Sequence, residues 1–440
     1  MVTARRMRGK RSEGAIDALG VVFDDDNAVA NAGLILPATL AGRLGLERLV
    51  DETLDLGIRP GAFSPGRKVM SLVHSILAGG DSIDDADVLR AGSSAAVLGH
   101  RVMAPSTLGT FLRSFTFGHV RQLDRVAEIA MTRAWAAGAG PGAQAMTIDL
   151  DSTVCEVHGY RKQGAAFGHT KVRGYHPLLA TRAQTGEVLH VRMRKGSANS
   201  GRGAQRFVRE LVGRARRAGA EGPLVIRADA GFWSAKVIGA CRHHGVRFSI
   251  TVRQVRPITR AIAEIPERDW APIDYTLGGI AQVAETRYRG MRLVVRRTRL
   301  VEAQGELVPD WRHHAFVSDR LGSAIELDAD HRRHAVIELA IRDIKEGSGL
   351  AHCPSGRFFA NSAWLVIASL AHNLVRWIAQ IGLGIQGTVV AATIRRRLVA
   401  VPGRITRSAR RRVMHLPSAW PWAEPFARAI TRLRAVSLQI

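Results

Sequence analysis

The chain has 440 residues, with 63 Lys or Arg against 38 Asp or Glu, and its formal net charge at pH 7 is +25. This surplus indicates a polyanionic partner, for which nucleic acid is favoured over an acidic membrane. Most of the basic residues are arginines, which bind phosphate through two parallel hydrogen bonds. A GC-rich genome would explain arginine in place of lysine, but not the surplus of charge. The three cysteines have no CxxC spacing, so they indicate neither a disulfide framework nor a thiolate zinc site, and they favour a reducing cytoplasm.

The length predicts two or three domains, and the first is an all-helical domain over residues 1–140. A basic, mobile arm precedes its helices. Pro65 and Pro105 fit the first position of two helices, and a long helix follows over His119–Trp135. A linker of Gly, Ala and Pro at residues 138–142 then leads out of this domain.

A short strand over Met146–Val154 carries two acids on one face. Apolar and polar residues alternate there, so Asp149 and Asp151 share the face opposite the buried one. Acids are poor strand formers, so their presence needs a reason. The strand end can simply cap a turn. Alternatively, either carboxylate can belong to a metal site, because hard cations bind carboxylate oxygens held on rigid backbone.

Two basic loops that contain glycine follow this strand. The first loop carries Lys171 and Arg173, and the second carries Arg194 and Lys195. Glycines between basic residues suit a loop that approaches a phosphodiester backbone, although each loop can equally be a flexible surface loop. The second loop lacks the GxxxxGK[ST] spacing, which argues against a nucleotide-binding loop.

A buried strand over Leu224–Ala228 ends directly at Asp229. In open α/β sheets, ligands bind at the carboxyl ends of strands, so Asp229 is a second candidate metal ligand. The surrounding elements follow the order of three strands, helix, strand, helix, strand. The other predicted strands and helices are Tyr175–Thr181, Glu187–Arg194, Gly203–Ala218 (helix), Ser234–His244 (helix) and Val246–Val252.

After this series of strands and helices, the sequence predicts several short strands. They are followed by a helix whose polar face carries both acidic and basic residues. These strands are Ile280–Glu285, Met291–Arg297 and Trp311–Val317. The polar face of the helix that follows consists of His331, His334, Glu338, Arg342 and Lys345. This face is either a salt-bridged surface, or Glu338 is a metal ligand flanked by groups that hold a phosphate backbone.

Alternatives exist on the same helix. His331 and His334 could suggest a zinc site, but no further ligand has a matching spacing. Helical geometry places Asp343 on another side of the helix and Glu346 further along its axis, so neither acid can replace Glu338.

The C-terminal third contains one long apolar stretch, Ala363–Gly384. Because His372 and Arg376 lie in its middle, it is predicted to be a buried helix rather than a membrane span. Residues 395–440 are the most densely basic part of the chain. They fit either DNA contact outside an active site or a disordered, solvated tail.

The segments IDLDSTV and IRADAGFW, together with the Glu338 helix, resemble the DDE transposases of insertion sequences, specifically the IS1380 family within the IS4-like group. The resemblance covers about residues 33–422. The last motif of that group has Tyr, Arg, Glu and Lys at the spacing of four residues of this helix. Glu338 and Lys345 agree with it, whereas His331 and His334 replace Tyr and Arg.

The resemblance also implies which strand acid binds metal. IS4-like relatives place this acid directly before a Ser/Thr pair, as Asp151 is placed here, with Asp149 as its rival. Related insertions hold an aromatic side chain against a base displaced from the DNA end. Trp270 and Trp311 are the residues that could do so here, although a tryptophan in a small strand-rich domain is more often part of the core.

The implied fold is α/β, with a ribonuclease-H-like catalytic core in two parts, residues 141–252 and 319–394. A strand-rich insertion over residues 253–318 separates these parts. The helical domain of residues 1–140 would bind DNA, and the basic segment 395–440 would follow the core.

The implied activity is metal-dependent cleavage and strand transfer of DNA at inverted-repeat ends. Asp151, Asp229 and Glu338 would hold two Mg²⁺ or Mn²⁺ ions. The partners would be double-stranded DNA of the element ends and the target, together with a second copy of the chain in a homodimeric synaptic complex. No membrane is expected, and the setting would be the bacterial cytoplasm at the nucleoid. A nuclease with the same fold and an inactive, DNA-binding repressor are the alternatives.

Overall fold

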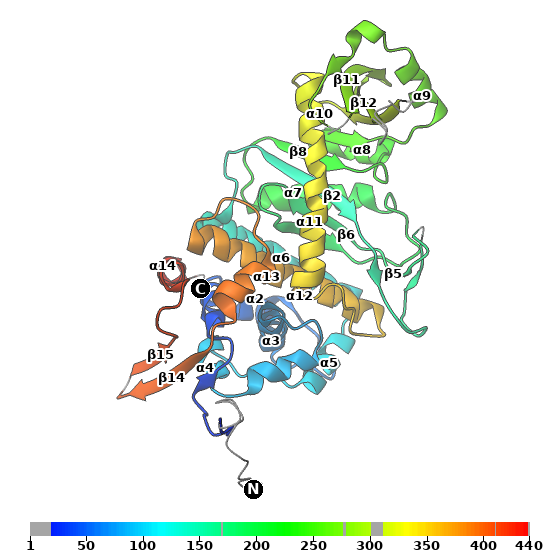
Figure 1. Cartoon of the computed structure of the whole chain (residues 1–440). Helices are drawn as coiled ribbons and strands as arrows, with labels where there is room; N and C mark the ends of the chain where they lie inside the picture. The colour runs from blue at the N-terminus through cyan, green and yellow to red at the C-terminus, as the bar shows by residue number, and fades with distance from the viewer. Residues whose placement is uncertain (1–18, 169, 276–278, 301–310, 410, 439–440) are drawn as a thin grey trace, which may run out of the picture.

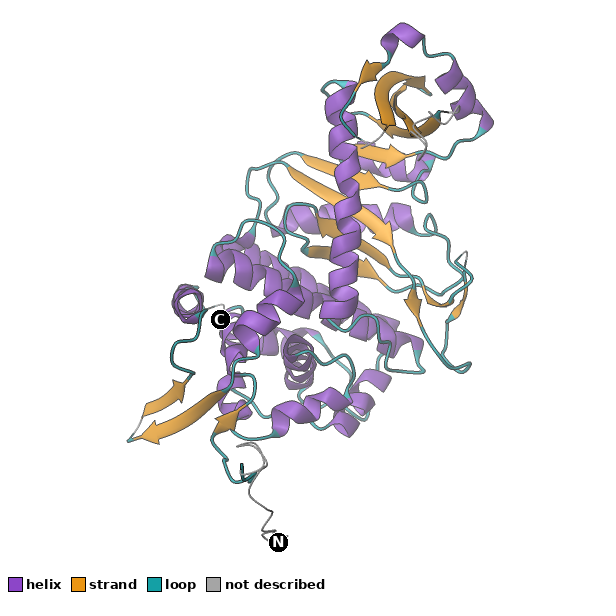
Figure 2. Ribbon diagram, in the orientation of Figure 1, coloured by secondary structure: helices purple, strands orange, loops and turns teal. Residues whose placement is uncertain are grey.

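The computed structural model describes residues 19–168, 170–275, 279–300, 311–409 and 411–438. The basic arm expected at the start of the chain therefore lies largely outside the described residues. Figure 1 and Figure 2 show a helical body from which a large sheet and its helices extend. The mixed α/β class predicted from the sequence is confirmed.

The first part of the chain forms the helical body, and Pro65 and Pro105 occupy the first turns of α3 and α5, as predicted. Proline fits there because the first helical N–H groups have no partner within the helix. The helices are α1 (Ile35–Arg43), α2 (Leu46–Thr53), α3 (Pro65–Ala78), α4 (Ser94–Leu98), α5 (Pro105–Arg113) and α6 (Phe117–Ala134). Short 3-10 or π segments occupy Ala32–Leu34, Asp84–Arg90 and Trp135–Ala139.

Five strands form the centre of the sheet in the spatial order β7-β6-β2-β8-β9. Strand β2 pairs antiparallel with β6 and parallel with β8, and β9 continues the parallel part. The strands are β2 (Met146–Ser152), β6 (Leu178–Arg182), β7 (Val188–Arg192), β8 (Leu224–Ala228) and β9 (Arg247–Thr251). Helices α7 (Ala204–Ala218) and α8 (Ala235–His243) connect them at the predicted positions.

The strand predicted over Tyr175–Thr181 is divided in the structure. Its first part is β5 (Arg173–Tyr175), which belongs to a small separate sheet, and the second part is β6. Pro177 lies between the two parts and cannot donate a backbone hydrogen bond, so the ladder cannot run through it. The small sheet has the order β3-β5-β4 and contains β3 (Cys155–Glu156) and β4 (Ala166–Phe167).

The strand-rich segment predicted as an insertion does not form a separate sheet. Strand β13 pairs antiparallel with β9, so the central sheet continues outward in the order β9-β13-β12-β11-β10. Without β13, the backbone groups at the edge of β9 would have no partner. The segment contains α9 (Arg256–Ala263), the 3-10 turn Glu267–Asp269, β10 (Ala271–Pro272), β11 (Gly279–Tyr288), β12 (Met291–Leu300) and β13 (Arg312–Ser318).

One long helical rod crosses the sheet, drawn in yellow in Figure 1. It begins with a capping box, in which Ser323 and Glu326 bond to each other's backbone N–H groups. Its outer end packs on the outer strands and its middle on β2. The rod consists of α10 (Ala324–Arg332), a 3-10 turn (Arg333–Ala335), α11 (Val336–Arg342) and a π turn (Asp343–Gly347).

The apolar stretch of the C-terminal third is a buried helix, α12 (Phe358–Trp377), followed by a π segment, Ile378–Leu383. Among the described residues, this is the one helix long and apolar enough to cross a membrane, and 89% of its apolar window is buried inside the structure. It packs against β7 and the helices of the body, which confirms the predicted buried helix.

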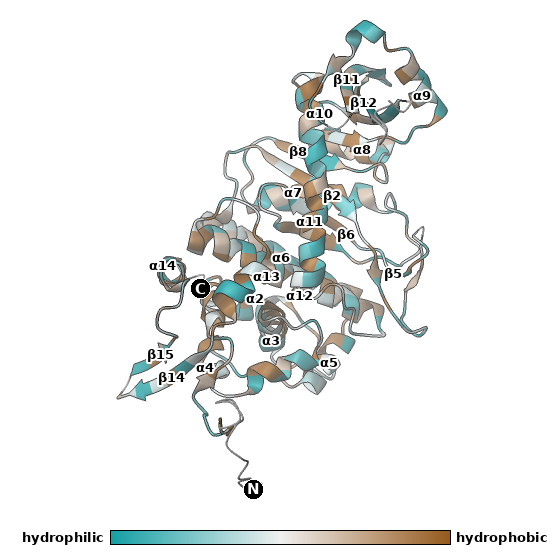
Figure 3. Ribbon diagram, in the orientation of Figure 1, coloured by the Kyte–Doolittle hydropathy of each residue, from teal (hydrophilic) through white to brown (hydrophobic). Residues whose placement is uncertain are grey.

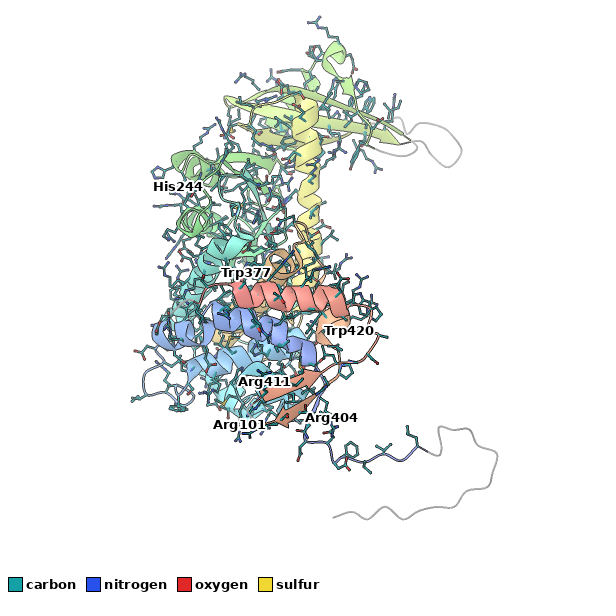
Figure 4. All side chains as sticks on the ribbon, turned by 90° about the vertical axis from the view of Figure 1, so that its left-hand side faces the viewer. Arg101, His244, Trp377, Arg404, Arg411 and Trp420 are labelled. Carbon is teal, nitrogen blue, oxygen red and sulfur yellow. The ribbon has the colours of Figure 1, made fainter. Side chains whose placement is uncertain are left out.

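Glu187 joins the helical body to the edge of the sheet. Its fully buried carboxylate accepts hydrogen bonds from Trp135 Nε1 (2.9 Å), at the end of α6, and from Trp377 Nε1 (2.8 Å), at the end of α12. Burial raises the pKa of Glu187 to about 7, although the two indoles and Arg182 favour the charged form. Figure 4 labels Trp377 at this joint.

The C-terminal segment is folded against the body, which differs from the disordered-tail alternative. Strand β1 (Ala28–Val29) pairs with β14, so this segment meets the first described residues. Figure 3 shows the apolar residues gathered within the body and hydrophilic residues along β14 and β15. The elements are α13 (Ala391–Ile394), the π turn Arg395–Val399, β14 (Gly403–Ser408), β15 (Arg411–His415) and α14 (Ala423–Ala435).

Candidate functional site

The sheet brings two of the predicted acids to the same edge. The parallel register of β2 and β8 ends with Leu150 beside Ala228. Asp151 is the next residue on β2, and Asp229 directly follows the end of β8. Helix α11 crosses β2 and carries Glu338. Three carboxylates from distant parts of the sequence therefore face the carboxyl ends of neighbouring strands.

The charges of the other two carboxylates act on Asp151. The pKa of Asp151 is raised to about 6, mainly by burial, and the negative charges of Asp229 and Glu338 contribute to this rise. The N–H of Ser152, 2.6 Å from Asp151 Oδ1, and the nearby His334 act in the opposite direction. At neutral pH this group of like charges is held together at an energetic cost.

The donor set fits a divalent cation. Carboxylate oxygens are the ligands that Mg²⁺ and Mn²⁺ prefer, and a bound cation would relieve the repulsion that raises the Asp151 pKa. Within the described ranges, no three His, Cys, Asp or Glu side chains are already close enough together to hold a metal ion. The three carboxylates would therefore have to move closer to bind one ion together.

Asp149, the rival strand acid, is engaged elsewhere. It is fully buried and accepts two hydrogen bonds from the Arg227 guanidinium, at 2.8 and 2.9 Å. His334 Nδ1 lies 2.9 Å from Asp149 Oδ1. Asp149 and Arg227 are direct neighbours in the β2–β8 ladder. This acid fixes the rod and two strands to each other.

Arg227 is a residue that the sequence analysis did not single out. Its guanidinium also reaches Asp330 Oδ1 at 3.3 Å, which ties β8 to the outer part of the rod. A signal was present, because an arginine in the middle of a buried apolar strand requires a buried acid as its partner. The sequence pattern alone does not say which acid this is, because Asp149 reaches Arg227 only through the register of β2 and β8.

His331 was expected to contact DNA, but it lies inside the protein, where DNA cannot reach it. Its ring is buried, lies within hydrogen-bond distance of Ser249 Oγ (2.8 Å) and Thr251 Oγ1 (2.9 Å), and stacks on Phe316. Desolvation holds its pKa well below the usual value, so the ring is neutral. These hydroxyl partners also leave neither ring nitrogen free for the zinc alternative, and His334 is bound to Asp149.

Arg194 was expected to contact DNA, but it supports the loop from inside. It is buried, and its Nη1 donates to the carbonyl oxygens of Asn199 (2.7 Å) and Arg202 (3.0 Å). This holds the loop so that Ser200 Oγ lies 2.9 Å from Ser152 Oγ, directly after Asp151. The side chain therefore shapes the border of the site from beneath.

The remaining basic candidates differ in exposure. Lys345 donates to Val154 O at 2.8 Å, and Arg173 donates to Tyr160 O at 2.9 Å, so both stabilise backbone around the small sheet. Lys171, Lys195 and Arg342 are exposed. The exposed side chains are the ones free to reach a phosphate without rearrangement of the loops.

The two tryptophans of the strand-rich segment share one arginine. The Arg297 guanidinium lies 4.1 Å from the Trp270 ring centroid and 4.3 Å from that of Trp311, and Arg299 also covers Trp311. Trp270 is buried, which corrects the expectation that it could stack on a displaced base. Trp311 is half-buried, with both guanidinium groups against its ring.

The helical register agrees with the choice of Glu338 over its neighbours. Asp343 is buried and accepts a hydrogen bond from Arg376 Nη2 at 2.6 Å and another from the Ala391 N–H at 2.9 Å. Its carboxylate is therefore committed to the body. Glu346 is exposed beyond it, and Glu338 is the acid whose charge acts on Asp151.

Comparison with known proteins gives a family and a likeness to solved structures. The sequence matches the family described as Transposase DDE domain group 1 over residues 14–438. Among solved structures, the piggyBac transposase in a cryo-EM synaptic complex with hairpin DNA is similar, with a TM-score of 0.46 and 10% sequence identity. The likeness covers 84% of this chain and 79% of that chain. No curated protein matches the sequence.

Proposed function

The chain belongs to the family of transposase DDE domain group 1, and on that premise we propose that it cleaves and joins DNA at the inverted-repeat ends of an insertion sequence. The observation that carries this proposal is that Asp151, Asp229 and Glu338 converge at the carboxyl ends of β2 and β8, where the parallel register of the strands and the crossing of α11 bring them together. Within this family we assign the element to the IS1380 group of IS4-like transposases.

The proposed catalytic core has the ribonuclease-H-like topology. Three antiparallel strands, β7, β6 and β2, adjoin two parallel ones, β8 and β9, and the rod supplies the last acid. This arrangement supports the proposal because it places each acid on, or directly after, an element of the core. These elements hold the backbone of the site in place, and the three side chains would close on the metal ions from there.

Asp151, Asp229 and Glu338 would hold two divalent ions, Mg²⁺ or Mn²⁺. When bound, such ions polarise the scissile phosphate and lower the pKa of the attacking hydroxyl. The protein itself orients the groups. Asp149 and Arg227 lock β2 to β8, and the Asp149 contact to His334 sets the rotation of the rod that carries Glu338. No side chain of the protein is needed as a nucleophile.

Double-stranded DNA is the proposed partner, both as element end and as target. The net charge of +25 and the exposed side chains of Lys171, Lys195 and Arg342 support this choice. Trp311 is proposed to contact the DNA end. We further propose a homodimer that holds two ends together, acting at the nucleoid in the bacterial cytoplasm.

The test uses linear DNA that carries the genomic flanks of the gene with their inverted repeats. With Mg²⁺, the protein should nick at the repeat ends and join the resulting 3′-hydroxyl to a second duplex. Asp151→Asn, Asp229→Asn and Glu338→Gln should each abolish both steps, whereas the exposed Glu346→Gln on the same helix should retain most activity. Cleavage by wild type without joining would favour the nuclease alternative. Binding without any cleavage would favour a repressor.

A further inference from the structure

Strands β14 and β15 form a two-stranded ribbon that projects from the helical body (Figure 1). Its residues are mostly exposed, and Figure 4 labels Arg404 and Arg411 on it. The catalytic carboxylates lie on other elements, those of the central sheet and the rod. The ribbon is therefore a separate surface that the proposed chemistry does not use.

The base of the ribbon is firmly attached. Ile405 and Met414 are cross-strand partners, and both pack against the core of the body. The Ile405 N–H donates to Asn27 O at 2.9 Å, and β1 pairs with β14 beside it. A two-stranded ribbon is marginally stable alone, so these contacts hold the outer half in a defined direction.

The outer half of the same face carries two arginines in direct opposition. Arg407 and Arg412 are cross-strand partners, two residues beyond Ile405 and Met414, and both are exposed. Like charges directly opposite each other destabilise a strand pair. Among the residues that the structure describes, neither arginine forms an ion pair or a side-chain hydrogen bond.

A second pair of opposed arginines occurs in the central sheet, and its surroundings differ from those of the ribbon pair. Arg287 and Arg292 are also direct cross-strand partners, in β11 and β12. There Arg292 donates to Glu285 Oε2 and to the carbonyl oxygens of Arg320 (2.9 Å) and Gly322 (2.8 Å), so one of the two guanidinium groups has an acidic partner. The ribbon pair has no such partner among the described residues, which leaves both guanidinium groups available to an external anion.

We propose that the β14–β15 ribbon binds duplex DNA by lying in a major groove, with Arg407 and Arg412 on phosphate groups. A two-stranded ribbon fits the width of that groove, and guanidinium groups pair with phosphate in bidentate fashion. The opposite face would add Arg411 and His415, both exposed. The inference rests on the proposed function only for the identity of the polyanion as DNA.

The test compares two double variants by fluorescence anisotropy on a mixed-sequence 20-base-pair duplex, in EDTA and over a range of KCl concentrations. Arg407→Thr/Arg412→Thr keeps strand propensity and removes the pair. It should weaken binding by at least about tenfold and lower the salt slope by about two, since each phosphate contact contributes about 0.9. The control, Arg428→Ala/Arg434→Ala on α14, removes the same charge from the same segment and should change affinity by less than about threefold.

Equal losses in the two variants would overturn the inference, because the effect would then come from net charge. An equal loss on single-stranded DNA would overturn the groove geometry, and ribbon-dependent binding to phosphatidylserine vesicles without duplex binding would replace DNA with a membrane. Cleavage at the repeat ends separates this inference from the proposed function. If wild type cleaves and the ribbon variant binds normally, the ribbon inference alone fails.

Discussion

Asp149 and Asp151 lie two residues apart on one face of β2, yet their surroundings differ in nearly every respect. Asp149 is fully buried, and Arg227 and His334 satisfy it. Asp151 is half-buried, has one N–H donor in its own backbone, and faces two other acids. The comparison teaches that a strand position determines the face of a carboxylate, while its neighbours across the sheet determine its chemistry.

The largest expected effect is a loss of DNA-cleavage activity, and it distinguishes Asp151 from Asp149. Asp151→Asn should lower DNA cleavage on the order of a thousandfold, because one ligand of the proposed metal site is lost. The same variant should keep or slightly raise the free energy of unfolding, since a repelled charge is removed. Cleavage assays and urea denaturation measure the two quantities. An active Asp151→Asn variant would reverse the assignment of the two acids.

The second effect concerns stability. Asp149→Asn leaves Arg227 buried without its charged partner and should cost about 3–5 kcal/mol of unfolding free energy. Asp330→Asn is the matched control, because Asp330 also contacts Arg227 but remains partly exposed. It should cost less than about 1 kcal/mol. Equal costs in urea denaturation would show that the buried pair is not the anchor of β2.

Glu187 extends the comparison to an acid that is buried with indole donors. Its pKa is raised from 4.5 to about 7, so the folded protein binds this proton more tightly than the unfolded chain does. Stability from this group is therefore present below pH 4.5 and is lost as the pH rises to about 7, by about 3 kcal/mol. Glu187→Gln should lack this loss, so its stability relative to wild type should increase over that window. A constant difference between the two proteins would refute the shift.

The smallest expected effect is the number of protons that the protein releases when it binds Mg²⁺. At pH 6 about half of the Asp151 carboxyls carry a proton, given the pKa of about 6. Saturation with Mg²⁺ should release up to about half a proton per chain, which an indicator dye in weak buffer can measure. Asp151→Asn should release much less. Equal release from both proteins would place the titrating ligand elsewhere.

Local patterns were sufficient to predict much of the fold. The buried strand that ends at Asp229, the helices of the body and the buried helix α12 each depend on residues close in sequence. The partner of Asp149 could not be predicted in the same way, because Arg227 reaches it only through the register of β2 and β8.

The incorrect expectations have a common cause. His331 belongs to a polar stripe on the helix, but β13 brings Phe316 against its ring and β9 supplies two hydroxyl groups. Arg194 lies in a glycine-containing loop whose carbonyl oxygens turn inward toward its guanidinium. In both cases the folded backbone encloses a side chain that the local pattern places at the surface: distant strands enclose His331, and the loop itself encloses Arg194.

The pairing of β1 with β14 has a consequence for the order in which the protein is made. Ala28 lies beside Arg404 in this register, so a ribosome must synthesise the entire intervening chain before the pair can form. The strands β2 to β9 emerge earlier and can associate before β1 has paired with β14. Contacts of such long sequence separation form slowly. A newly made molecule would thus assemble its carboxylates before it closes its ribbon, and its last folding step would be the docking of the surface proposed to hold DNA.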